Sequence, residues 1–297
     1  MTFTAAVAQY PVERLTSWDS YAAKLERWIS EAAARGAKLA VFPEYGAMEL
    51  AALDPATMGD LAGSLASVAA LLPQVDCLHA ELAARFGMHI LAGSGPYRRA
   101  DGSFVNRARL VAPGGKIGVQ DKLIMTRFER EQWGIAAGGP LRVFNTALGR
   151  IGVLICYDSE FPLLARAQIE AGAQLLLVPS CTDSLHGYWR VRLAAQARAL
   201  EGQCYALQAP LVGSADWSPA IDMNRGAAGI FGPPDGAFPD DGVVALGPLD
   251  AGQWLFGEID LARVGAVQGS GAVLNVRHWA EQPGAASLPQ VEVIDLA

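Results

Sequence analysis

A cysteine, a glutamate and a lysine in this chain each stand at the end of a short apolar segment. Cys156 follows residues 151–155, which are typical of a buried strand, and a polar turn comes directly after it. Glu44 and Lys122 end similar segments near residues 38–42 and 116–122. Because α/β proteins build sites at the C-terminal ends of their strands, all three residues are candidates for a catalytic centre.

The chemistry that these residue types allow is nucleophilic attack by a thiol. Cys156 needs a base to form a thiolate, and a tetrahedral adduct needs hydrogen-bond donors for its oxyanion. A buried Glu44 has a raised pKa and can take the thiol proton, then return it to a leaving amine. Lys122 can place positive charge beside the oxyanion. Each residue alone also has a purely structural explanation, since a cysteine packs like a small hydrophobic residue and charged residues at strand ends are commonly solvated.

The elements that must position these residues follow from the hydrophobic periodicity. Residues 36–43 and 172–179 echo each other, because both leave a helix through glycine and carry an apolar strand into proline. The echo predicts two related β-α-β units and a pseudo-symmetric sandwich of two mixed sheets, each with helices on its outer face. We expect helices at 17–35, 59–86, 162–171 and 188–201, and strands at 3–9, 38–42, 88–93, 104–112, 116–122, 141–145, 151–155, 175–178, 204–210, 227–231, 243–246 and 254–259.

Length and composition predict one large domain. The 297 residues contain 52% hydrophobic and 18% charged residues, and no polar low-complexity linker divides them. We therefore expect a single domain over 1–297, with 280–297 as a C-terminal tail. No uninterrupted apolar run reaches the length of a membrane span, and the first residues lack the pattern of a secretion signal, so we expect a cytoplasmic protein.

The polar residues argue against several classes of partner. The net charge of −7 comes without a Lys/Arg-rich run, which argues against binding to nucleic acid or an anionic membrane. The four cysteines show no Cys-x-x-Cys spacing and the four histidines are scattered. The observed distribution of cysteines and histidines is therefore typical of neither a disulfide scaffold nor a zinc site. We therefore expect free thiols, no metal and no cofactor.

The order of the motifs resembles that of the nitrilase superfamily of carbon-nitrogen hydrolases. Phe42-Pro43-Glu44 comes first, Lys122 follows a hairpin, and Cys156-Tyr157-Asp158 comes last, with a further Phe-Pro pair after it. The resemblance runs from Ala6 to Asp260 and includes Asn106 and the helical segment 197–201. The residues after Cys156 resemble the amidase and carbamoylase branches more than the true nitrilases.

This resemblance implies a single carbon-nitrogen hydrolase domain with a Glu-Lys-Cys triad of Glu44, Lys122 and Cys156 that works through a thioester. The Tyr157 backbone N–H would join Lys122 in binding the oxyanion. A second catalytic glutamate is also implied, and two candidates lie close together. We prefer Glu129, because it precedes Trp133-Gly134 at the spacing seen in nitrilases, and Glu131 would then be a solvated loop charge.

The resemblance also implies a four-layer αββα sandwich and a homodimer or higher homo-oligomer, paired through the helices that follow Cys156 and Tyr188. Trp189 opens the second of these helices, where relatives bring it near the substrate. An ordinary amphipathic helix explains this tryptophan equally well. Two departures from the family, Asp121 before the lysine and Gly202 after the helix glutamate, weaken assignment to a well-studied subgroup.

The predicted function is hydrolysis of a small linear amide or N-carbamoyl compound with release of ammonia or amine. The nearest alternatives keep the thioester but hydrolyse a nitrile, or pass the acyl group to an amine. From other classes come a non-catalytic binding protein and a redox sensor in which Cys156 is the reactive thiol. The intact set of Glu44, Lys122 and Cys156 argues against the binding protein, and reaction of Cys156 with an amide-mimicking electrophile much faster than with peroxide would argue against the redox sensor.

Overall fold

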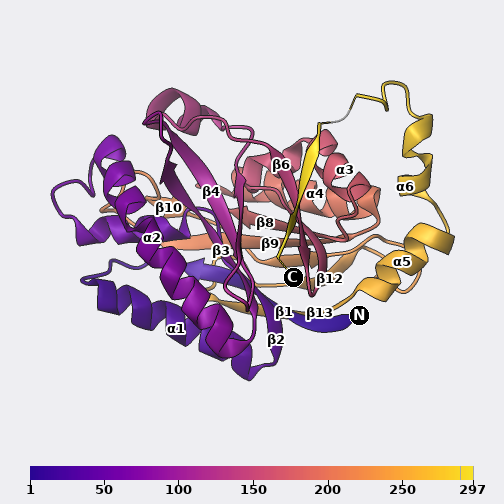
Figure 1. Ribbon diagram of the computed structural model, residues 1–297, viewed down its shortest axis with the longest axis horizontal. Coiled ribbons are helices and arrows are strands. Elements are labelled where there is room, and N and C mark those ends of the chain that lie inside the picture. Colours follow the sequence, from indigo (N-terminus) through magenta and orange to yellow (C-terminus); the bar gives the residue numbers. More distant parts are fainter. Residues whose placement is uncertain (288, 297) are drawn as a thin grey trace.

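The structure, a computed structural model, describes residues 1–287 and 289–296 (Figure 1). Its first half begins with a β-α-β unit in which β1 and β2 are parallel neighbours. Two further helical segments lead to β3, which continues into antiparallel β4 and β5. The elements of this half are β1 (Thr2–Pro11), α1 (Trp18–Ala34), β2 (Ala37–Val41), the 3₁₀ helix η1 (Gly46–Leu53), α2 (Leu61–Phe86), β3 (His89–Arg98), β4 (Phe104–Val111) and β5 (Ile117–Asp121).

The second half repeats this plan. Strands β7 and β8 are parallel neighbours on either side of a helix, as the sequence echo predicts, and β9 follows in parallel. Its elements are the π-helical turn η2 (Glu129–Trp133), β6 (Leu141–Thr146), β7 (Gly149–Val153), η3 (Cys156–Glu160), α3 (Pro162–Glu170), β8 (Leu175–Ser180), α4 (Leu185–Gly202), β9 (Tyr205–Ser214), β10 (Met223–Asn224), β11 (Gly229–Phe231), β12 (Val243–Leu246), β13 (Gln253–Asp260), α5 (Leu261–Ser270), α6 (Asn275–His278), η4 (Trp279–Glu281) and β14 (Val291–Asp295).

Strand pairing joins the two halves into one sheet. Its strands run in the order β14-β6-β7-β8-β9-β1-β2-β3-β4-β5, with the remaining strands paired to β1, β9 and β11. The halves meet where β1 pairs with β9 at Tyr10–Leu211 and Pro11–Val212, and β13 of the second half also pairs with β1 along eight residue pairs, from Thr2–Asp260 to Gln9–Gln253. The far strands come close again where Arg142 of β6 donates its backbone N–H to Gln120 of β5 at 2.8 Å. The α/β class with mixed strands is confirmed, but the expected separation into two sheets is not, since the single sheet curls toward a barrel.

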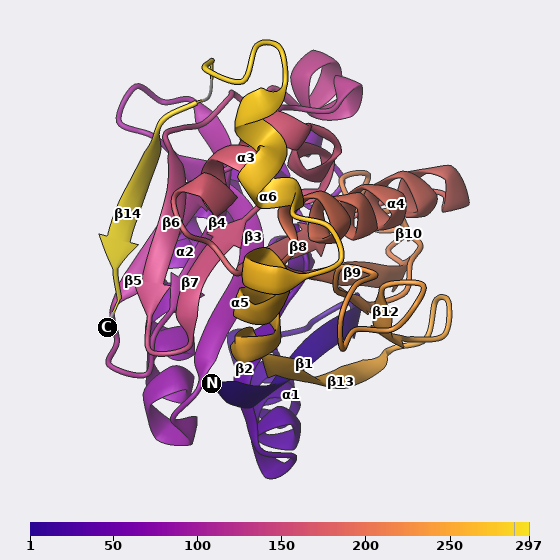
Figure 2. The same ribbon diagram turned by 90° about the vertical axis from the view of Figure 1, so that its right-hand side faces the viewer.

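Helices cover the two halves of the sheet separately (Figures 1 and 2). Helices α1 and α2 pack against β2 and β3, while α3 packs against β6 and β7, and α4 packs against β8 and β9. Helix α6 packs against α4 and lies near α5 at the same end of the molecule. Two clusters of buried apolar side chains form the core. One lies under α1 and α2 in the first half, and the other joins β1, β2 and β4 to the strands and helices of the second half.

Helix ends follow the expected capping chemistry. Ser17 caps α1, because its side chain accepts a hydrogen bond from the Ser20 N–H, as predicted. Helix α4 begins three residues earlier than expected, since Ser184 caps it through the N–H of Gly187. Helix α5 was not predicted from the sequence. Asp260 caps it through the Ala262 N–H, but two glycines within its Leu261–Ser270 segment lower the helix propensity.

Two features bear on the predicted surroundings of the chain. Helix α2 is, within the described part of the chain, the one helix long and apolar enough to cross a membrane by length and composition. Core helices of soluble proteins pass the same test, and α2 buries Leu65, Val68 and Leu72 as it packs against β3. The cytoplasmic location stays a prediction. Residues Val291–Asp295 of the expected tail form β14, which extends the sheet beside β6.

Candidate active site

The four predicted catalytic residues converge from separate strand ends. Glu44 follows β2, Lys122 follows β5, Cys156 opens η3 just beyond β7, and Glu129 opens η2. All four are buried, with exposed fractions of 1% for Glu44, 1% for Lys122, 2% for Glu129 and 4% for Cys156. Charged residues are almost never buried so fully unless they are paired, so their contacts decide what this cluster can do.

Lys122 holds the two glutamates together. Its Nζ lies 2.7 Å from Glu44 Oε1 and 2.6 Å from Glu129 Oε2. An ammonium group carries three N–H donors, so these two bonds leave one donor for another acceptor. The backbone fixes the start of this side chain, because the Lys122 N–H donates to the Asn106 carbonyl at 2.8 Å.

Glu129, not Glu131, is the glutamate at the lysine. Besides Lys122, its carboxylate accepts the Tyr45 hydroxyl at 2.8 Å and both the N–H and hydroxyl of Thr126, at 3.0 and 2.9 Å. Glu131 instead forms a surface pair with Arg127 at 3.0 Å. This placement agrees with the spacing argument from the sequence.

Glu44 is linked to the nucleophile through the backbone of Cys181. Oε1 accepts from Lys122 and from Asn106 Nδ2, the latter at 2.9 Å, while Oε2 accepts the Cys181 N–H at 2.9 Å. The Cys156 Sγ contacts the Cys181 carbonyl at 3.9 Å. Cys181 therefore contacts both Glu44 and the thiol through its backbone.

A strained turn presents the thiol. Cys156 has a φ of +50°, a left-handed conformation that non-glycine residues adopt rarely and mostly where the surroundings enforce it. Ser159 Oγ donates to the Cys156 carbonyl at 2.6 Å, and Arg198 in turn donates to the Ser159 carbonyl at 3.2 Å. The Asp158 carboxylate accepts the Ile155 N–H at 3.3 Å. These contacts enforce the turn.

Burial and mutual charge set the proton positions. Burial, and then the neighbouring charge of Glu44, raises the pKa of the Cys156 thiol well above its ordinary value, although Lys122 opposes the shift. Burial also raises the pKa of Glu44, against the charge of Lys122. For Glu129, burial is outweighed by Lys122 and by its hydrogen bonds, so its pKa is lowered. The pKa of Lys122 is raised well above its usual range, because the two carboxylates outweigh its burial. The raised pKa favours the protonated thiol, and the Glu44 carboxylate is its candidate base.

A cavity of about 670 Å³ opens above this cluster. Glu44, Lys122, Glu129 and Cys181 line it, and the Sγ of Cys156, which is not itself a lining residue, lies 3.9 Å from the Cys181 carbonyl oxygen. Its walls and rim come from Tyr45, Thr126, Arg127, Phe128, Trp133, Tyr157, Glu160, Thr182, Asp183, Gly187, Arg190, Pro219, Ala220, Asp222 and Met223.

Tyr157 lines the cavity, but Trp189 does not. Gly187 and Arg190 of α4 line it, whereas Trp189 is 46% exposed and packs against Tyr188 and Arg192. Successive helical residues point about 100° apart, so a tryptophan one position before Arg190 faces away. Trp189 is therefore not a lining residue of this cavity, and its expected place beside the substrate stays a prediction.

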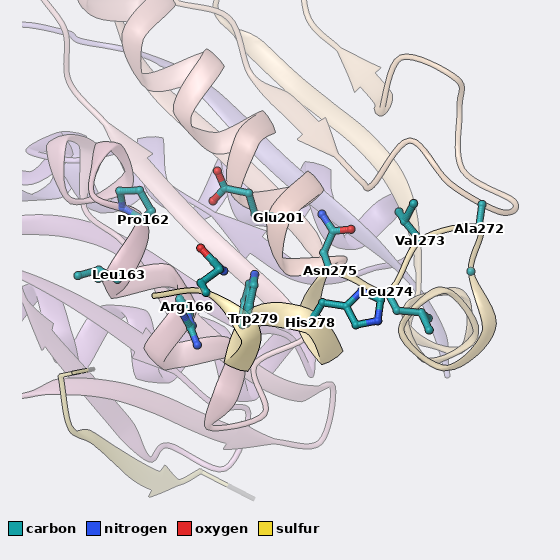
Figure 3. A pocket seen from close by; sticks show the side chains of 12 residues that line it. Pro162, Leu163, Arg166, Glu201, Ala272, Val273, Leu274, Asn275, His278 and Trp279 are labelled. Atoms are coloured by element: carbon teal, nitrogen blue, oxygen red, sulfur yellow. The ribbon is translucent and has the colours of Figure 1, made fainter. Parts of the chain in front are cut away.

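A second cavity, of about 800 Å³, lies elsewhere (Figure 3). It is formed by α3, the end of α4 and the segment from α5 to η4, with Arg166, Glu201 and Trp279 among its lining residues. None of the four clustered residues reaches it. The 800 Å³ cavity is therefore separate from the cluster that contains Cys156.

Sequence reasoning missed several residues that complete the cluster. Tyr45 and Thr126 bind Glu129, and the only available signals were their positions beside Glu44 and three residues before Glu129. Asn106 entered only as a family match, yet it touches both glutamates. Asp158 entered as part of the motif after the nucleophile, without a role.

Comparison with known proteins agrees with this geometry. Residues 4–267 match the carbon-nitrogen hydrolase family. The chain belongs to that family. Within it, the probable hydrolase YhcX of Bacillus subtilis is 34% identical over 255 residues, which cover 86% of this chain and 49% of that protein. This carbon-nitrogen hydrolase chain thus spans about half the length of that relative.

Two further members of the family differ in their stated chemistry. An aliphatic nitrilase of Sinorhizobium fredii is 30% identical over 233 residues, covering 74% of this chain and 72% of the nitrilase. Among solved structures, a double mutant of the amidase from Nesterenkonia sp. AN1 with acrylamide matches with a TM-score of 0.66 at 18% identity, over 88% of this chain and 91% of the amidase. The second likeness shows the fold alone. The predicted membership of the nitrilase superfamily is confirmed.

Proposed function

We propose that this chain hydrolyses a small linear amide or N-carbamoyl compound through a thioester on Cys156, without metal or cofactor. The observation that carries the proposal is that the backbone of Cys181 contacts both the buried Cys156 thiol and the Glu44 carboxylate, which Lys122 joins to Glu129. A thiol beside a base, with a free ammonium donor next to it, is the arrangement that acyl transfer needs.

The first half-reaction forms the thioester. Glu44 takes the Sγ proton as Sγ bonds to the amide carbon, and the carbonyl electron pair moves to its oxygen. The remaining N–H of Lys122 and the backbone N–H of Tyr157 bind this oxyanion. When the oxyanion collapses, the C–N bond breaks and Glu44 gives its proton to the departing nitrogen. Ammonia or an amine leaves, and the acyl group stays on Cys156.

The second half-reaction returns the enzyme. Glu44 takes a proton from water, whose oxygen bonds to the thioester carbon, and the C–S bond breaks on collapse. The proton passes from Glu44 to Sγ, and the carboxylic acid leaves. Glu129 keeps Lys122 charged throughout and remains ionised itself, which its lowered pKa supports.

The test uses matched cysteine variants. Cys156→Ala and Glu44→Gln should abolish ammonia release from a panel of aliphatic amides and N-carbamoyl compounds, whereas Cys77→Ala, which removes an exposed free thiol, should leave it unchanged. Intact-protein mass spectrometry of the wild type after brief exposure to the panel should show an acyl adduct on Cys156. Full ammonia release by either of the first two variants contradicts the mechanism.

Nitrile hydrolysis is the second candidate, and the likeness to the aliphatic nitrilase favours it. The same thiol would attack the nitrile carbon. Parallel assays with propionamide and propionitrile separate the two, since a nitrile preference assigns the chain to the second function. Acyl transfer to an amine would instead show product only when an acceptor amine is supplied.

We also propose that the chain forms a homodimer through α4. Its solvent side carries a stripe of large apolar side chains, with Leu185 40%, Trp189 46%, Leu193 60% and Leu200 43% exposed. Such a stripe on an isolated helix face is typical of a protein interface. In such a dimer Trp189 lies in the contact between the subunits and not at the substrate.

A further inference from the structure

Asn106 lies between the two buried glutamates. It belongs to β4, and its side chain is completely buried. Its Nδ2 donates to Glu44 Oε1 at 2.9 Å and to Glu129 Oε1 at 3.3 Å. The amide is thus the only neutral group among the described residues that binds both carboxylates, and it does so from the middle of a sheet.

The strand makes Asn106 a rigid donor. Its carbonyl accepts the Lys122 N–H at 2.8 Å, and β4 pairs with β3 through Pro96 opposite Asn106. A lysine side chain rotates about several bonds, whereas an asparagine side chain rotates about only two. Lys122 therefore supplies the positive charge, and the more rigid Asn106 fixes the orientation of Glu44 Oε1.

Packing alone does not call for an amide here. Within the described part of the chain, no group donates to Asn106 Oδ1, although its surroundings are fully buried. A buried polar atom without a partner is costly, and an apolar side chain of similar shape avoids that cost. The contacts of Nδ2 with the carboxylates are what an apolar residue cannot replace.

We propose that Asn106 is a positioning residue, which holds Glu44 Oε1 so that Oε2 faces the Cys156 thiol and the substrate. The inference rests on the proposed role of Glu44 as the base. A leucine at position 106 removes one of the two side-chain donors to Oε1, so that Lys122 alone holds this oxygen while Oε2 keeps the Cys181 N–H.

Loss of this donor also has a defined electrostatic sign. A hydrogen bond to the charged form of an acid favours that form, and burial disfavours it. Without Nδ2, burial raises the pKa of Glu44 further, so Glu44 takes up its proton at a higher pH. Thiol activation then fails at a higher pH than in the wild type.

The experiment follows alkylation of Cys156 by iodoacetamide as a function of pH, with the modified peptide quantified by mass spectrometry. This probe does not depend on knowing the substrate. Exposed Cys77 serves as an internal reference whose alkylation should not differ between variants. In Asn106→Leu, the acidic limb of the Cys156 profile should move up by about one pH unit or more.

Asn145→Leu is the matched control, because it makes the same change on β6, and Asn145 lines neither cavity. Its acidic limb should stay where the wild type has it. Asn106→Ser, which is smaller and polar, provides a second variant if the leucine prevents folding, as judged by circular dichroism. A limb that stays in place in the folded position-106 variant, with only a uniform fall in rate, overturns the proposal.

Glu44→Gln separates the two levels of inference. If its Cys156 alkylation shows the same acidic limb as the wild type, the base is not Glu44, and the proposed function is wrong at that step. If the limb disappears in Glu44→Gln but does not move in the position-106 variant, only the role of Asn106 is wrong.

Discussion

The Asp158 carboxylate accepts the backbone N–H of Ile124 at 2.9 Å, which ties the turn of the nucleophile to the segment just after Lys122. The neighbouring N–H of Leu123 contacts the same carboxylate at 3.2 Å. A side chain two residues from Cys156 thus fixes the backbone two residues from the lysine. Any change at Asp158 alters the relative position of nucleophile and ammonium.

Asp158 gives the stability of the protein a defined pH dependence. Burial raises its pKa from 3.8 to about 7, although Lys122 and the backbone N–H groups oppose the shift. The folded state therefore keeps the proton up to about pH 7, whereas the unfolded chain loses it near 3.8. Its contribution to stability is complete below the unfolded pKa and is lost as the pH rises through the folded pKa.

We expect the difference in free energy of unfolding between wild type and Asp158→Asn to fall by about 4 kcal/mol between pH 4 and pH 8. Urea unfolding at several pH values measures it. Exposed Asp183 provides the control, and Asp183→Asn should track the wild type at every pH. A difference that stays constant for the Asp158 variant contradicts the assignment.

The two neighbouring glutamates should respond very differently to amidation. Glu129→Gln removes the charge that Lys122 contacts at 2.6 Å, so kcat should fall by about a hundredfold or more. Glu131→Gln removes half of an exposed pair with Arg127, and its kcat should stay within about twofold of the wild type. Initial rates of ammonia release measure both. Equal losses in the two variants contradict the site as described.

A buried ion pair outside the site sets a stability prediction. Lys24 and Glu49 lie 2.7 Å apart, with 2% and 0% of their side chains exposed, and the Tyr10 hydroxyl donates to Glu49 at 2.6 Å. Lys24→Met strands the Glu49 charge and should lower the free energy of unfolding by about 3–5 kcal/mol. Lys24→Met combined with Glu49→Leu should recover part of this loss. Urea unfolding of the two single variants and the double variant gives the coupling, and strictly additive losses would count against it.

The α4 stripe makes a prediction about mass in solution. Leu193 is 60% exposed at its centre, and Leu193→Glu places a charge in the proposed contact. Sedimentation velocity should show a dimer for the wild type and a monomer for this variant. Ile117→Glu, on the distant strand β5 and 36% exposed, should remain dimeric. A monomeric wild type removes the proposal.

Much of the fold was predictable because each element carries its own local signal. The periodicity of residues 17–35 and the cap at Ser17 depend on neighbours in the sequence, so α1 was found nearly to its bounds. The β1–β9 link was not, because two residue pairs leave no periodic trace. Helix α5 was missed for the opposite reason, since its glycines argue locally against a helix that packing nevertheless maintains.

The candidate site was predictable in its residue types and less so in its supports. Strand ends and motif order predict that Glu44, Lys122 and Cys156 lie together, and the structure joins Glu44 to Lys122 directly and to Cys156 through the backbone of Cys181. Trp189 shows the limit, because a one-residue change of helical phase decides whether a side chain enters a cavity. Tyr45 reaches Glu129 from a left-handed backbone conformation with a φ of +56°. Its neighbours in the sequence do not predict this conformation.

The core between the two halves has a consequence for how the protein works. Glu44 and Lys122 come from the first half of the chain and Cys156 from the second, so the cluster crosses the border between halves. One group of buried apolar side chains spans that border, since it joins Val7 and Leu39 of the first half to side chains of β7, β8 and β9. The halves therefore cannot move apart without opening this core. The base and the nucleophile are kept in register by the same apolar packing that stabilises the fold.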